Sequence, residues 1–126
     1  MKFTAWFCLI VGAFIFISWV FFFVTGQVPE LATEPYAIAA HLIAEAATAV
    51  VLIIAGVGLL GRRGWAASVA LVGLGMLVYT VINSSGYFAQ QGDWPPVFVF
   101  ALLLLLALAS MRPLLRSPFH GLNADL

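Results

Sequence analysis

Residues 5–24 read Ala-Trp-Phe-Cys-Leu-Ile-Val-Gly-Ala-Phe-Ile-Phe-Ile-Ser-Trp-Val-Phe-Phe-Phe-Val and contain no charged side chain. A helix needs about 20 predominantly apolar residues to cross the hydrocarbon core of a bilayer. The rest of the chain has the same character, because 64% of its 126 residues are hydrophobic and only 8% are charged. Soluble domains carry about 25% charged residues, so we expect lipid to be the solvent of this chain.

Four apolar segments of this kind alternate with short polar breaks. The segments are continuous, whereas a membrane β-barrel would alternate apolar and polar residues with a period of two, so we expect helices. Pro35 suits the first turn of the second helix, and Gly61 is expected to end it. Arg112 and Pro113 are expected to stop the last helix. Short breaks make neighbouring helices antiparallel. The sequence thus predicts one all-α domain over residues 1–126, a four-helix transmembrane bundle with short loops whose spans cover about 5–24, 34–60, 65–88 and 95–111.

The basic side chains all fall on one side of this arrangement. They are Lys2, Arg62, Arg63, Arg112 and Arg116. The loops on the opposite side carry Glu30, Glu34 and Asp93 and neither Lys nor Arg. Because loops rich in Lys and Arg stay on the cytoplasmic side, we expect an N-in/C-in topology with both termini in the cytoplasm. The expected location is the plasma (inner) membrane of a bacterium or an archaeon.

Charge and cysteine content exclude several classes of protein. Five basic and five acidic side chains give a formal net charge of zero, so no nucleic-acid partner is expected. Cys8 is the single cysteine, which rules out an intrachain disulfide and a Cys-x-x-Cys redox motif. His41 and Glu45 offer two ligands where a zinc site needs three or four, so we expect neither a metal nor another cofactor.

His41 and Glu45 are the ionisable residues inside the second apolar span. Their spacing of four places them on one helix face. At a rise of about 1.5 Å per residue, Glu45 lies roughly 15 Å along the helix from Pro35, near the middle of a bilayer. Ionisable groups at that depth are costly, and by default they indicate a functional site.

The third span has a polar stripe of its own. Its members, at intervals of seven, four, four and four, are Ser68, Gly75, Tyr79, Asn83 and Tyr87. Because the second and third spans are antiparallel, Tyr79 falls at about the depth of Glu45, and Asn83 at about that of His41. We therefore predict an intramembrane polar cluster for ligand or proton binding, made of His41, Glu45, Tyr79 and Asn83, with Thr48, Ser18 and Tyr87 around it.

Two protonation patterns are open for this cluster. Glu45 is either protonated and donates a hydrogen bond, or ionised and paired with a cationic His41. A purely structural role is also open, since polar side chains fix the register of membrane helices by hydrogen bonding across their interfaces.

The leading functional hypothesis is a small integral membrane protein that acts as a subunit or accessory component of a homo- or hetero-oligomeric membrane assembly. The alternatives are a small proton-coupled carrier or channel-like protein that uses Glu45 and His41, and a membrane-embedded enzyme or receptor for a lipid-soluble ligand. Catalysis is the least favoured of these, because no nucleophile or cofactor motif accompanies the polar residues. The expected partners are the lipid bilayer, protein subunits and, in the last alternative, a lipid-soluble ligand.

Overall fold

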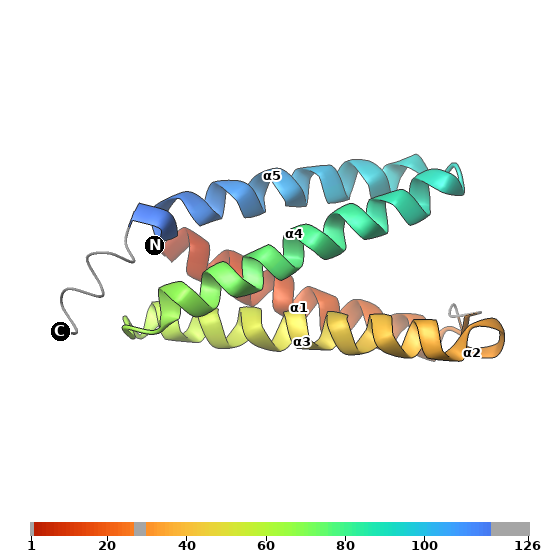
Figure 1. Cartoon of the computed structure of the whole chain (residues 1–126), viewed down its shortest axis with the longest axis horizontal. Helices are drawn as coiled ribbons and strands as arrows, with labels where there is room; N and C mark the ends of the chain where they lie inside the picture. The colour runs from red at the N-terminus through yellow and green to blue at the C-terminus, as the bar shows by residue number, and fades with distance from the viewer. Residues whose placement is uncertain (1, 27–29, 117–126) are drawn as a thin grey trace.

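The computed structural model describes residues 2–26 and 30–116, and the regular structure in these ranges is entirely helical (Figure 1). The helices are α1 Lys2–Val24, α2 Glu30–Thr33, α3 Pro35–Leu60, α4 Ala66–Gln90 and α5 Trp94–Arg116. Four of them, all except the short α2, are long and apolar enough to cross a membrane. The predicted all-α bundle with four membrane-length helices is confirmed at this level.

Helix ends differ from the predicted ones where packing outweighs local sequence. The prediction that the last helix stops at Pro113 was wrong, because α5 runs on to Arg116. Proline removes one backbone N–H donor and its ring crowds the carbonyl four residues earlier, so continuing the helix past Pro113 has a cost that other contacts must offset. Leu114, the next residue, is fully buried, and its packing holds this last turn in place.

The end of α3 is closed by backbone hydrogen bonds in which Arg62, rather than Gly61, adopts the left-handed conformation. Arg62 has a φ of 54°, while Gly61 has a φ of −83°. The N–H of Arg63 donates to the carbonyl of Gly58 at 2.9 Å, and the N–H of Arg62 donates to that of Leu59 at 3.2 Å. This is the Schellman pattern of helix termination, in which the left-handed position is usually glycine.

The helices pair as two antiparallel hairpins, α1 with α3 and α4 with α5, and α3 with α4 joins the two pairs. In Figure 1 the pairs lie close together at the end that holds the N-terminus and the α3–α4 turn. They separate toward the end that holds α2 and the α4–α5 turn. Lys2, Arg62 and Arg63 belong to the first of these ends.

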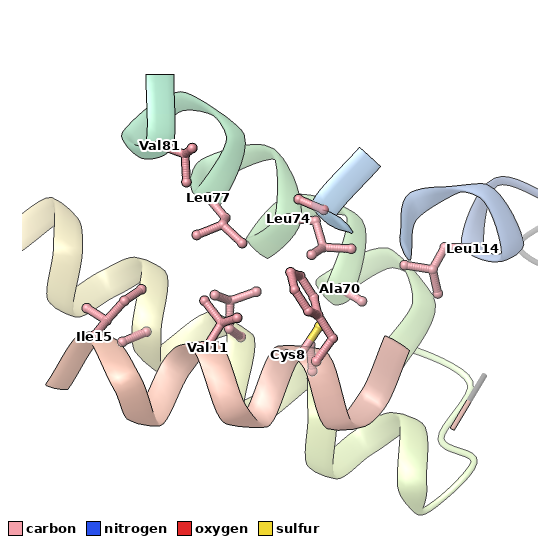
Figure 2. Packing of buried hydrophobic residues seen from close by; sticks show 13 residues of the cluster. Cys8, Val11, Ile15, Ala70, Leu74, Leu77, Val81 and Leu114 are labelled. Atoms are coloured by element: carbon pink, nitrogen blue, oxygen red, sulfur yellow. The ribbon is translucent and has the colours of Figure 1, made fainter. Parts of the chain in front are cut away.

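The buried core lies in the half of the molecule where the hairpins meet. Figure 2 shows Cys8, Val11 and Ile15 of α1 turned toward α4. The labelled residues that they meet from α4 and α5 are Ala70, Leu74, Leu77, Val81 and Leu114. Leu52, Leu74 and Leu77 of this cluster lie between the basic end and Glu45 along α3 and α4.

Two glycines let α1 and α3 approach each other more closely than other residues would allow. A Cβ atom on Gly56 would lie 2.8 Å from the carbonyl oxygen of Ala5, and one on Gly12 would lie 3.0 Å from that of Ala49. Small residues at such contacts are typical of helices that pack in membranes.

Candidate functional site

The carboxylate of Glu45 is buried between α3 and α4, with only 7% of the residue exposed. Its partner is the hydroxyl of Thr80 on α4, which donates a hydrogen bond to Oε1. A buried carboxyl group is costly unless it has such a partner. The Glu45–Thr80 hydrogen bond therefore ties the two hairpins together at the depth of the candidate site.

His41 lies one turn of α3 away from Glu45, on the same face. Its Nε2 is 3.8 Å from Oε1 of Glu45, and its side chain is about one third exposed. The indole of Trp19 on α1 meets the imidazole edge to face, with ring centroids 5.6 Å apart and planes at 67°. Three helices thus contribute to this cluster of side chains.

Tyr79 and Asn83 are more exposed than Thr80, the residue that donates a hydrogen bond to Glu45. Tyr79 is 72% exposed, and Asn83 is also exposed. Successive residues on a helix point about 100° apart, so Thr80 faces α3 while its neighbour Tyr79 is turned sideways. The carboxylate of Glu45 therefore accepts its hydrogen bond from Thr80, the neighbour of the Tyr79 that the sequence places at about the same depth.

Tyr79 and Asn83 do meet His41 across a cavity of about 180 Å³ between α3 and α4. Its walls are His41, Ala44 and Thr48 from α3, and Met76, Tyr79, Thr80 and Asn83 from α4. Glu45 lies beside this cavity through its bond to Thr80. The arrangement places hydrogen-bonding groups around a small space with apolar walls.

The residues expected around the cluster differ in their positions. Thr48 is buried, lines the cavity, and donates a hydrogen bond from its hydroxyl to the carbonyl of Ala44 at 2.8 Å. Ser18 is half-buried on α1, and its neighbour Trp19 makes the contact with His41. Tyr87 packs edge to face on Phe88, with ring centroids 5.2 Å apart, and does not line the cavity.

Thr80 and Met76 are the residues of this site that the sequence argument missed. Thr80 lies on α4 at about the depth that the residue count gives for Tyr79, and Met76 lies about one turn further along the helix. A signal for Thr80 was present, because it is a hydroxyl-bearing residue at the height of Glu45 on an antiparallel neighbour. Within residues 2–26 and 30–116, no group of three or more His, Cys, Asp and Glu side chains is placed to hold a metal ion.

The fold and the site together define a class: an all-helical protein with four membrane-length apolar helices and a small, mostly apolar cavity with a few polar side chains between two of them. The chain belongs to the family described as "Domain of unknown function (DUF8058)", whose model matches residues 1–120. No curated protein and no solved structure matches the chain.

Proposed function

We propose that this protein is an integral component of a membrane assembly and acts through helix contacts inside the bilayer. In this proposal both termini face the cytoplasm, and the membrane is the plasma (inner) membrane of a bacterium or an archaeon. The clustering of Lys2, Arg62 and Arg63 at one end of the molecule supports this orientation, because positive charge is retained on the cytoplasmic side.

The observation that carries the proposal is the exposed face of α4, opposite the core. We define the α4 face as Ser68, Gly75, Tyr79 and Gly86, which recur at intervals of seven, four and seven. All four are exposed, and a Cβ atom added at Gly75 or Gly86 would have nothing within 4 Å. Small residues such as Ser68, Gly75 and Gly86 along one stripe are typical of a helix that packs against another helix.

The exposed face of α5 has the opposite character. Its exposed side chains in the middle of the helix include Leu102, Leu105 and Leu108. Leucine suits contact with acyl chains, and a lipid-facing surface needs no small or hydroxyl-bearing residues. The contrast between the two helices favours lipid around α5 and protein against α4.

The test is native mass spectrometry of the protein after gentle extraction from its own membrane. We expect the wild-type chain to appear in complexes, either with copies of itself or with another subunit. Gly75→Leu combined with Gly86→Leu should shift it to the monomer, because bulky side chains prevent close approach at both glycines. Ala101→Leu, the same kind of change at an exposed position of α5, should leave the complexes intact. A wild-type chain that is monomeric, or complexes that survive the double substitution, would contradict the proposal.

A further inference from the structure

The cavity between α3 and α4 holds hydrogen-bonding capacity that the described part of the chain does not use. Asn83 and Tyr79 are among its lining residues, and no hydrogen bond joins either to another described residue. The amide of Asn83 and the phenol of Tyr79 can each donate and accept. The Thr80 hydroxyl donates its hydrogen to Glu45, and its oxygen can still accept a hydrogen bond. In an apolar surrounding, such groups gain from a partner that both donates and accepts.

The volume limits what that partner can be. The cavity measures about 180 Å³. A dry protein cavity of about 150 Å³ is large enough to bind benzene. The space therefore fits one ring-sized group, while a larger molecule would have to keep its remainder outside, among the acyl chains.

The charge and chemistry of the lining residues narrow the class of molecule that the cavity can bind. His41 is the one ionisable side chain besides the Tyr79 phenol among the cavity walls, which contain no Lys, Arg, Asp or Glu. Oε1 of Glu45 already accepts a hydrogen bond from Thr80, so an uncharged partner suits the walls better than a charged one. Met76 and Ala44 supply apolar surface, and a methionine thioether makes favourable contacts with aromatic rings.

We propose that this cavity binds the uncharged, hydroxyl-bearing aromatic head of a lipid-soluble molecule, of the phenol or hydroquinone class. The ring lies against Met76 and Ala44, and Asn83 hydrogen-bonds its hydroxyl. The tail of the molecule remains in the lipid. This site does not depend on the assembly proposed above, because α3 and α4 of a single chain form its walls.

The test uses the full-length protein in phosphatidylcholine nanodiscs and a photoreactive 4-alkylphenol that carries a diazirine on its ring. Labelled peptides are mapped by mass spectrometry. We expect labels to concentrate in residues 41–48 and 76–83. Excess 4-nonylphenol should compete with the label, while nonylbenzene, which partitions into the same lipid but lacks the hydroxyl, should not.

Two variants separate specific binding from simple partition into lipid. Asn83→Leu, which removes the amide from an exposed position, should raise the 4-nonylphenol concentration needed for half competition about tenfold. Ala44→Phe, which fills the cavity with a ring of the chain's own, should abolish the labelling of both segments. Gly75→Leu with Gly86→Leu should leave the labelling unchanged even where it dissociates an assembly.

Equal competition by nonylbenzene would overturn the proposal, as would labels spread evenly over lipid-facing residues. An unchanged competition curve in Asn83→Leu would overturn it as well. A cavity that holds only water would give no saturable competition at all, which is a fourth contradicting result.

Discussion

Glu45 has a hydroxyl rather than a cation as its hydrogen-bond partner, and this distinguishes its pairing from an ordinary ion pair. His41 is close, but at 3.8 Å its Nε2 lies beyond hydrogen-bonding distance of the carboxylate oxygen. The hydrogen bond from Thr80 is thus the direct polar contact that the described residues give this carboxyl group across the two hairpins.

Replacing Thr80 with valine tests the contribution of that hydrogen bond. Thr80→Val keeps the shape of the side chain and removes the donor, so it should lower the free energy of unfolding by about 1–2 kcal/mol. Thr80→Ser, which restores the hydroxyl, should recover most of the loss. The measurement is thermal unfolding in detergent, followed by circular dichroism.

Thr48→Val is the matched control for this prediction. The Thr48 hydroxyl is buried on α3 within one turn of Glu45, but it donates only to the carbonyl of Ala44 in its own helix. We expect a smaller effect than at Thr80. Equal losses from the two valine substitutions would show that the contact between hairpins adds nothing.

The individual residues of the site also show how much of it could be predicted from the sequence. The spacing of His41 and Glu45 gave their shared face, and counting along antiparallel helices gave the height of their neighbours on α4. Counting residues along a helix gives the depth of a side chain but not its direction around the helix axis. The choice between Tyr79 and Thr80 depends on how α4 is turned by its contacts through Leu74 and Leu77, which the sequence does not specify.

At the scale of the helices, the close contact between α1 and α3 predicts a large effect of a small substitution. In Gly56→Ala the new Cβ atom would lie 2.8 Å from the carbonyl oxygen of Ala5, so the helices must move apart. We expect a loss of about 1–3 kcal/mol in unfolding free energy. Gly75→Ala, measured on the monomer in detergent, has open space around it and should cost nothing.

Steric-trap or thermal unfolding of both glycine variants would check this difference. A Gly56→Ala protein as stable as the wild type would show that the two helices are free to separate without loss. The comparison is informative because alanine has the higher helix propensity at both positions, so propensity alone predicts stabilisation in each.

The helices were largely predictable, because long apolar runs bounded by Pro35 and by glycine-containing turns leave few alternatives in lipid. The misplaced end at Pro113 shows where that argument fails. A local signal for termination was overridden by the burial of Leu114 against other helices, and burial is a property of the assembled fold.

At the scale of the whole molecule, the core occupies one half and the cavity lies beside it between α3 and α4. Residues buried in that core should therefore dominate stability. Leu74→Ala removes a side chain that is 0% exposed and should cost about 2–5 kcal/mol. Leu105→Ala, at a position 65% exposed on α5, should have little effect, because lipid fills the space. Unfolding in detergent measures both, and similar losses would place the core elsewhere.

The position of the core relative to the cavity also bears on the hypothesis that this protein is a proton-coupled carrier or channel. Between Glu45 and the basic end, the described chain places Leu52, Leu74 and Leu77, all buried and apolar. A solute or proton entering from the cavity would have to pass these side chains to reach the basic end.

The separation of the two hairpins at the end holding α2 has a consequence for the surrounding lipid. Where the four long helices cross a bilayer, hairpins that lie close at one end and apart at the other present different outlines to the lipid of the two leaflets. The resulting difference in lateral pressure is relieved when the bilayer bends, or when lipids of unequal head-group size sort around the narrow and wide ends. We therefore expect the membrane's spontaneous curvature to influence how this chain is distributed within it.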